Sequence, residues 1–160
     1  MAEAELKERF LAVWNGMAGN REHLIADCRA AKEILCDCKA INAEIAELER
    51  EVEVTTELSR KAIFENARTA QNQAEFKQRN DGYLERQRVA TERIAALEAE
   101  RKAKRHKARI LENFIRNLEA SPSVLTEFDE KLWTTTIDRV IVHEDGRLVF
   151  RFLNGSEYVG

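Results

Sequence analysis

The segment ILCDCKAINAEIAELEREVEVTTELSRKA (residues 34–62) decides the fold of this chain. Apolar or small residues recur in it at alternating steps of four and three: Ile34, Cys38, Ile41, Ile45, Leu48, Val52, Thr55, Ser59 and Ala62. A repeat of 3.5 residues places these side chains on one narrow face of a helix, here termed the seam. This spacing is typical of a coiled coil rather than of a helix in a compact core.

A second series keeps the same spacing, in Phe76, Asn80, Tyr83, Gln87, Ala90, Ile94 and Leu97, and then in Ala108, Leu111, Ile115 and Leu118. The segment ENARTAQNQ (residues 65–73) between the two series is polar and has no sustained seam. We therefore expect the chain to reverse near residues 66–74, so that residues 20–120 form a long antiparallel two-helix coiled coil. Each arm is then about 70 Å long. A parallel dimer of continuous helices is the alternative.

The distribution of charge favours the hairpin. Residues 1–60 hold 13 acidic and 8 basic residues, whereas residues 61–120 hold 9 acidic and 14 basic ones, so the two arms attract each other. A reversal near Gln71 places the basic run RKAKRHKAR (residues 101–109) beside acidic residues of the first arm: Glu33, Asp37, Glu44 and Glu47. Such charges fix orientation and register more than stability, because an exposed pair contributes only about 0–1 kcal/mol.

Shorter elements are expected on either side of the coiled coil. Residues 1–19 predict a short helix from about Ala2 to Asn15, and Asn20 is placed as the N-cap of the first arm. The early apolar residues of that arm are one position out of phase with the later seam: Leu24, Cys28, Ala31 and Leu35. We expect the short helix to pack where this phase changes.

Residues 121–160 predict a short helix followed by a three-stranded meander. Pro122 ends the second arm, and VLTEFDEKLW (residues 124–133) is typical of a short amphipathic turn. The period then changes to two, and Asp145-Gly146 and Asn154-Gly155 are hairpin turn signals. The expected strands are Ile137–Val142, Leu148–Phe152 and Glu157–Val159. This meander is too small to be stable alone, so we expect it to pack at the base of the coiled coil on Phe10, Trp14, Phe128 and Trp133.

Composition limits the functions that the chain can have. It has 160 residues, 34% of them charged, and a net charge of −3, so the molecule as a whole does not attract nucleic acid. No apolar run is long enough for a membrane span, and MAEAELKERF at the start lacks the apolar core of a signal peptide. We therefore expect a cytoplasmic location.

The cysteines and histidines predict no catalytic or metal site. Cys36 and Cys38 are two residues apart on an expected helix and point to different faces, so they cannot jointly hold one ion. Cys28 and Cys38 are expected to act as small apolar residues near the seam. The histidines lie on separate elements and are expected to be solvated: His23, His106 and His143. We predict no catalytic residue, no metal ligand and no enzyme activity.

The ending EFDEKLWTTTIDRVIVHEDGRLVFRFLNGSEYV (residues 127–159) resembles the carboxy-terminal segment of large serine recombinases, the group of site-specific integrases and transposon resolvases. That group ends in an acidic-Phe pair, a Leu-Trp pair, a hydrophobic strand, a charged Gly turn and a Phe-x-Phe strand before a second Gly turn. ELKERFLAVWNGM (residues 5–17) and NREHLIADC (residues 20–28) are similar to the segment leading into its coiled coil. ENARTAQNQAEFKQRNDGYLERQ (residues 65–87) is similar to the tip of that coiled coil.

The resemblance implies a fold and a function. In that family the coiled coil is inserted into a zinc-binding domain, and coiled-coil contacts link recombinase subunits during synapsis and help to set the direction of recombination. The family's catalytic serine domain and its zinc-holding cysteine pairs are missing here, so the resemblance implies a non-catalytic fragment or truncated reading frame that does not cut DNA. The implied source is bacterial, phage or mobile-element. No cofactor is expected in the fragment, and zinc belongs to the missing upstream domain. The implied partners are other recombinase subunits, and DNA through the parent protein; a homodimer is an alternative, and no membrane is expected.

Two candidate surfaces follow. Ile63, Phe64 and Phe76 lie beside the expected reversal, where an exposed apolar tip suits docking between subunits; the alternative is that they close the end of the hairpin on each other. The basic run offers candidate phosphate contacts: Arg101, Lys102, Lys104, Arg105, Lys107 and Arg109. Its bases are expected to spread around the whole helix without Asn or Gln to read bases, so we favour a face complementary to the acidic first arm.

Two other classes of function stay open. One is a free-standing cytoplasmic nucleic-acid binder that uses residues 101–109. The other is a structural spacer or adaptor of unrelated origin.

Overall fold

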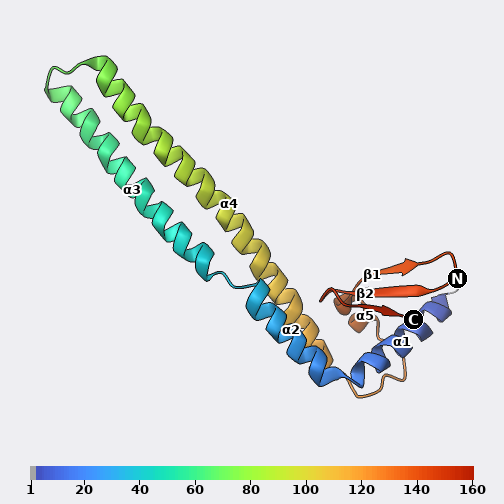
Figure 1. Ribbon diagram of the computed structural model, residues 1–160. Helices are drawn as coiled ribbons and strands as arrows, with labels where there is room; N and C mark the ends of the chain where they lie inside the picture. Colours follow the sequence, from blue (N-terminus) through green and yellow to red (C-terminus); the bar gives the residue numbers. More distant parts are fainter. Residues whose placement is uncertain (1–2) are drawn as a thin grey trace. The chain divides into compact units, whose positions relative to one another are not determined.

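The computed structural model describes residues 3–160, which are mainly helical and end in a small antiparallel sheet (Figure 1). The helices are α1 (Glu3–Ala18), α2 (Arg21–Leu35), α3 (Lys39–Arg68), α4 (Gln73–Ala120) and α5 (Glu130–Thr136). The strands are β1 (Ile137–Val142), β2 (Leu148–Phe152) and β3 (Glu157–Val159). The coarse prediction, a mainly α chain with a carboxy-terminal meander, is therefore confirmed.

The chain divides into two compact units. The base unit holds residues up to Cys36 together with Arg105–Gly160, and the hairpin unit holds Asp37–Lys104. Helix α4 contributes its second part to the base unit and its first part to the hairpin unit.

The base unit is built around an aromatic core. Phe10 and Trp14 from α1 are buried among α2, α4, α5 and the sheet. The other fully buried members of this core are Phe114 and Leu118 of α4 and Leu148, Phe150 and Phe152 of β2. Burial of aromatic side chains from several helices and a strand gives this unit the composition of a small globular core.

The sheet has the order β1-β2-β3 and covers this core with one face (Figure 1). Alternate residues of β2 are buried, as expected for a strand with one face on a core. The two turns place Gly146 at φ +82° and Gly155 at φ +89°, a conformation that side chains with a Cβ rarely adopt. The three strands have the bounds that the Asp-Gly and Asn-Gly signals predict.

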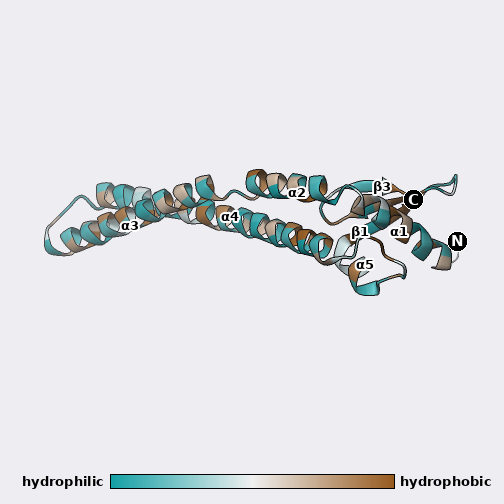
Figure 2. Ribbon diagram, turned by 90° about the horizontal axis from the view of Figure 1, so that it is seen from below, coloured by the Kyte–Doolittle hydropathy of each residue, from teal (hydrophilic) through white to brown (hydrophobic). Residues whose placement is uncertain are grey.

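In the hairpin unit, α3 and the first part of α4 run side by side in opposite directions (Figure 1). Ile41 and Ile45 of α3 are buried against Leu97 of α4, with Leu48 and Ile94 packed around them. Both helices are largely hydrophilic along their length, with apolar residues recurring at intervals (Figure 2). The chain reverses between Arg68 and Gln73.

Helix boundaries differ from the expected ones in three places. The first arm is not one helix: it is broken at Cys36–Cys38, where the seam changes phase, and Ile34, expected in the seam, is 75% exposed. Asn20 occupies the N-cap position, but its side chain makes no capping hydrogen bond. The short first helix extends to Ala18, whereas its expected start at Ala2 lies outside the described residues.

The expected amphipathic turn at residues 124–133 also shifts. The chain from Ser121 to Asp129 is irregular, and α5 begins only at Glu130. The reason is local: the Asp129 carboxylate accepts the backbone N–H of Leu132 at 3.0 Å and so fixes the start of the helix.

Arg101 of the basic run donates to Asn42, so the run begins beside the expected stretch of the first arm, but two acids of that stretch bind other bases. Glu44 binds Arg93 at 2.7 Å, and Glu47 lies 3.6 Å from Arg50 on its own helix. In the base unit the bases lie on α2 and the acids on α4, opposite to the expected distribution: Lys32 pairs with Glu112 and Arg29 with Glu119. Contacts of Ile41 and Ile45 with Leu97 set the register, and that register places Arg93 opposite Glu44.

Candidate interaction surfaces

The tip of the hairpin unit is closed by polar side chains. Asn72 accepts the backbone N–H of Ala74 through its side-chain oxygen at 3.0 Å and so starts α4. Across the reversal, the side-chain amides of Asn66 and Gln73 donate to each other's oxygens at 3.3 and 3.0 Å. These contacts fix the turn without using an apolar side chain.

The apolar residues at the tip lie largely outside. Ile63 is 53% exposed and Phe64 is 59% exposed on α3, whereas Phe76 is half-buried on α4. The Arg68 guanidinium lies over the Phe64 ring, 5.1 Å from its centroid. The ring nevertheless stays largely exposed to solvent. We term Ile63, Phe64 and Phe76 the tip surface.

The seam behind this surface is polar, in contrast. Thr55 and Ser59 are buried, and the Ser59 hydroxyl donates to the Asn80 side-chain oxygen at 2.6 Å. The Gln87 amide donates to the Thr56 hydroxyl at 3.1 Å. Near its tip the hairpin therefore buries small and polar side chains, Thr55, Ser59 and Ala62, while the larger apolar side chains Ile63 and Phe64 lie mostly outside.

The expected phosphate contacts separate into two groups. Arg101 and Lys104 are half-buried, and Arg101 donates to the Asn42 side-chain oxygen at 3.1 Å and lies 3.6 Å from Glu98. Exposed members of the run are Lys102, Arg105, Lys107 and Arg109. Arg105 is exposed although it directly follows the half-buried Lys104, because consecutive residues of a helix point about 100° apart.

Base packing involves all four residues singled out from the sequence. Phe10 and Trp14 are buried, and Phe128 and Trp133 pack against them at the surface of the core. The Phe10 ring contacts Trp133 edge-on at 5.0 Å between centroids, and Phe128 at 5.7 Å. Trp133 in turn meets Phe150 of β2 at 6.2 Å. These residues join α1, α5 and the sheet and are occupied by packing.

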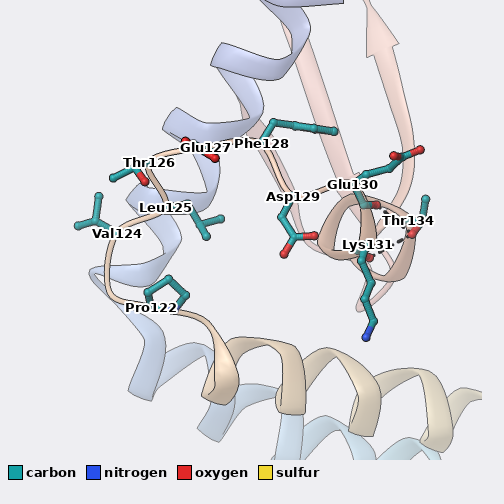
Figure 3. Close-up of a pocket in the computed structure, with 10 residues that line it drawn as sticks. All are labelled: Pro122, Val124, Leu125, Thr126, Glu127, Phe128, Asp129, Glu130, Lys131 and Thr134. Atoms are coloured by element: carbon teal, nitrogen blue, oxygen red, sulfur yellow. Dashed lines mark hydrogen bonds between the residues drawn. The ribbon is translucent and has the colours of Figure 1, made fainter.

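A hollow of about 820 Å³ follows the irregular chain before α5 and is lined by Pro122, Val124–Lys131 and Thr134 (Figure 3). Its polar groups serve the local fold, since Asp129 caps α5 and the Thr134 hydroxyl donates to the Glu130 carbonyl at 3.0 Å. We assign no ligand to it.

Chemistry-bearing side chains are dispersed. Burial raises the pKa of the Cys28 thiol, which makes it a poor nucleophile, and the Asn154 amide donates to its sulfur at 3.5 Å. Among residues 3–160, no three His, Cys, Asp or Glu side chains are grouped so as to hold a metal ion. Within the same residues, no helix combines the length and the apolar character that crossing a membrane requires.

Comparison of the chain with protein-family models, with curated proteins and with solved structures finds no match.

Proposed function

We propose that this chain is a non-catalytic interaction module whose tip surface docks on a second subunit. The observation that carries the proposal is the inversion near the tip: Ile63 and Phe64 are exposed while the seam beside them holds Ser59 and Asn80. Leaving large apolar side chains in water has no benefit for the isolated hairpin, whereas a partner that covers them gains their burial.

The proposal includes an antiparallel coiled coil formed by α3 and α4. Its support is the agreement between heptad spacing and burial: the buried residues of α3 are Ile41, Ile45, Thr55, Ser59 and Ala62, and those of the facing part of α4 are Ala90 and Leu97. Pairs that flank the seam have the same antiparallel register, with Glu51 bound to Arg86 and Glu44 to Arg93, each at 2.7 Å.

The biological setting of the proposal comes from the resemblance of residues 127–159 to the ending of large serine recombinases. In that setting the module belongs to a site-specific recombinase, and the tip contact joins subunits during synapsis and biases the direction of integration or transposition. The partner is then another subunit of the same protein. The tip carries both signs of charge, with Lys61 near Glu65 and Lys77 beside Asp81, which suits a contact between two identical surfaces.

Sedimentation of the full chain tests the docking role. We expect Ile63→Asp and Phe64→Asp to weaken self-association at least about tenfold, because each places a charge in the contact. Phe76→Asp is expected to weaken it less, since that side chain is already half-buried. Val54→Asp is the matched control, because Val54 is 51% exposed on the same helix away from the tip. Unchanged sedimentation of both tip variants contradicts the docking role.

The recombinase setting has a separate test. The genomic sequence immediately upstream of the codon for Met1 is expected to continue an open frame that encodes paired cysteines and a catalytic serine domain. A promoter at that place contradicts the setting but leaves the docking role of the tip intact.

A further inference from the structure

Three arginines on the base-unit part of α4 are exposed and point to a second binding surface. Arg105, Arg109 and Arg116 are exposed, and no hydrogen bond or ion pair to a carboxylate is found for them in residues 3–160. Other arginines of the base unit are held by carboxylates, as Arg29 is by Glu119 and Arg147 by Asp145. The three exposed arginines of α4 thus keep their guanidinium groups available to a ligand.

Helix geometry gathers these arginines on one face. With Asn113 they occupy positions i, i+4, i+8 and i+11, which at 100° per residue fall within an arc of about 80° and extend over about 16 Å. The six Lys and Arg residues of the run 101–109 spread around the helix, whereas Arg105 and Arg109 share one face with Arg116, which lies beyond the run. We term Arg105, Arg109, Asn113 and Arg116 the arginine stripe.

The neighbouring acid does not neutralise the stripe. Glu112 lies next to it on the helix, and a hydrogen bond from Lys32 lowers its pKa most, with a smaller effect from Arg116. The carboxylate is thus already bound by a cation of α2. Residues 101–111 contain no acidic residue at all.

One end of the stripe opens on a hollow of about 420 Å³ lined by Ile110, Asn113, Arg116, Asn117, Thr135 and Leu153. Its exposed polar groups are the Asn113 amide, which has a donor end and an acceptor end, and the Arg116 guanidinium, which is always charged. The Asn117 amide donates to the Thr135 hydroxyl at 3.1 Å, and that hydroxyl donates to the Lys131 carbonyl at 2.7 Å, so both groups are engaged in the local fold. A site with cationic and neutral donors and no carboxylate suits an anion.

We propose that the arginine stripe binds the phosphate backbone of duplex nucleic acid without reading its sequence. Guanidinium groups bind phosphate oxygens in pairs of hydrogen bonds, and a row along one helix face meets successive phosphates of a strand. The stripe has one amide, Asn113, for base contacts, so affinity comes mainly from charge and from release of counterions.

A membrane and a protein partner fit this surface less well. A helix that lies on a membrane needs large apolar residues beside its basic face, and a protein interface usually has an apolar or aromatic centre. The exposed large apolar side chains of α4 are Leu84 and Val89, both in the hairpin unit. The stripe itself has only polar and charged exposed side chains.

Fluorescence anisotropy with the full chain and a labelled duplex of arbitrary sequence tests the proposal. We expect the triple variant Arg105→Gln, Arg109→Gln, Arg116→Gln to raise Kd at least about tenfold at low salt. It is also expected to reduce the slope of log Kd against log salt by about 0.9 for each phosphate that the variant no longer neutralises. The variant with Lys at all three positions keeps the charge and is expected to retain most of the affinity.

The matched control removes the same charge from α3 by Arg50→Gln, Arg60→Gln and Lys61→Gln, whose side chains lie beside acidic residues of that helix. We expect this control and the tip variant Phe64→Asp to bind duplex like the unchanged chain. The proposal is overturned if the control loses as much affinity as the stripe variant, or if the unchanged chain does not bind duplex. It is also overturned if polyglutamate or phosphatidylserine vesicles depend on the stripe more than duplex does.

Discussion

The base unit and the hairpin unit are stabilised by different means. Several helices and strands meet in the base unit, where Phe10, Trp14 and Phe150 are almost completely buried. Two helices meet in the hairpin unit, where the apolar cluster consists of Ile41, Ile45 and Leu97 with two half-buried neighbours. A core of several elements resists local opening, whereas a helix pair opens more easily where its seam is polar. Large apolar side chains are thus buried together in the base unit, whereas Ile63 and Phe64 of the hairpin unit lie largely exposed.

The largest expected effect tests the base unit. Replacing Phe10 by Ala removes a ring that contacts Trp14, Phe128, Trp133 and Phe150, and it should lower the free energy of unfolding by about 3–5 kcal/mol. Denaturant unfolding followed by hydrogen exchange measures the loss and locates it. Val124→Ala is the control, since Val124 is 62% exposed and its truncation should change stability by less than about 0.5 kcal/mol. Loss of protection in α3 alone would contradict the assignment of Phe10 to the base unit.

A second variant tests the hairpin unit. Ser59→Ala together with Asn80→Leu replaces a buried polar pair by apolar side chains and is expected to raise the free energy of unfolding by about 1 kcal/mol. Polar seam residues fix register at some loss of stability, so the double variant should slow hydrogen exchange near the tip without affecting the base unit. Asn80→Leu alone leaves Ser59 without its partner and serves as the comparison. No gain in the double variant would mean that the polar pair stabilises the hairpin as well as apolar packing does.

The same comparison explains how much could be predicted from sequence. The seam of the hairpin and the three strands are local patterns: heptad spacing marks Ile41 and Ile45, and Asp-Gly and Asn-Gly mark the turns. The break at Cys36–Cys38 has no Pro or Gly, so the phase change of the seam is its only signal. A repeat of apolar residues is therefore enough to predict a helix or a strand. A helix boundary that depends on packing with distant residues cannot be predicted from the local sequence.

The two candidate surfaces also differ in how far they could be predicted from the sequence. Ile63 and Phe64 lie off the seam, and their exposure follows from helix periodicity. The arginine stripe does not stand out in the sequence, because Arg105 and Arg109 are two of many bases in the run 101–109 and Arg116 lies seven residues beyond that run. Its hollow depends on Thr135 and Leu153, which reach α4 only because the chain turns back after Pro122. Such a meeting of distant residues has no local sequence signal.

Acidification is expected to act on both units through their carboxylates. Three glutamates each accept a hydrogen bond that lowers the pKa of their carboxyl group. Arg93 donates to Glu44, Arg88 donates to Glu85, and Lys32 donates to Glu112. Since these folded-state values lie below the unfolded value of about 4.5, the stabilisation is complete above that pH and is lost as pH falls through the folded values. Thermal unfolding between pH 7 and pH 3 measures this, with Glu44→Gln and Glu112→Gln as variants that separate the two units. If the melting temperature stays constant as the pH is lowered past about 4.5, the expected loss of stability is contradicted.

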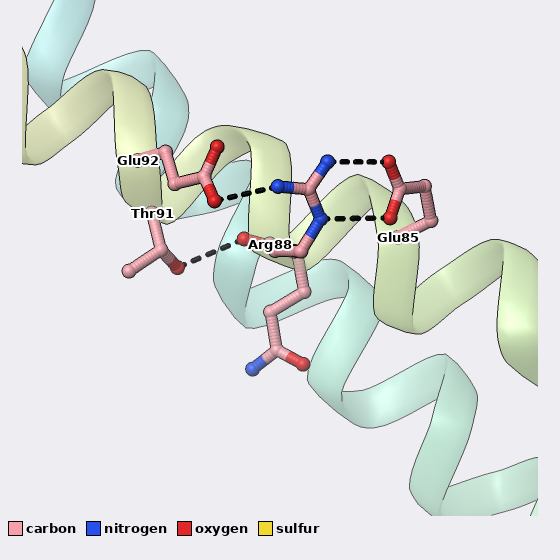
Figure 4. A network of polar contacts seen from close by, with 5 residues as sticks. Glu85, Arg88, Thr91 and Glu92 are labelled. Atoms are coloured by element: carbon pink, nitrogen blue, oxygen red, sulfur yellow. Dashed lines mark hydrogen bonds and ion pairs between the residues drawn. The ribbon is translucent and has the colours of Figure 1, made fainter.

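The smallest effect is expected on the outer face of α4, where Arg88 lies between Glu85 and Glu92 (Figure 4). The guanidinium is 2.7 Å from Glu85 and 2.5 Å from Glu92, and the two carboxylates raise its pKa. All three side chains are exposed, so solvent screens the pairs and Arg88→Ala should leave the free energy of unfolding almost unchanged. The loss should shrink further in about 1 M salt, which urea unfolding at two salt concentrations measures. A loss of stability as large as that caused by a seam substitution would show that helix-surface pairs, and not the seam, hold the hairpin together.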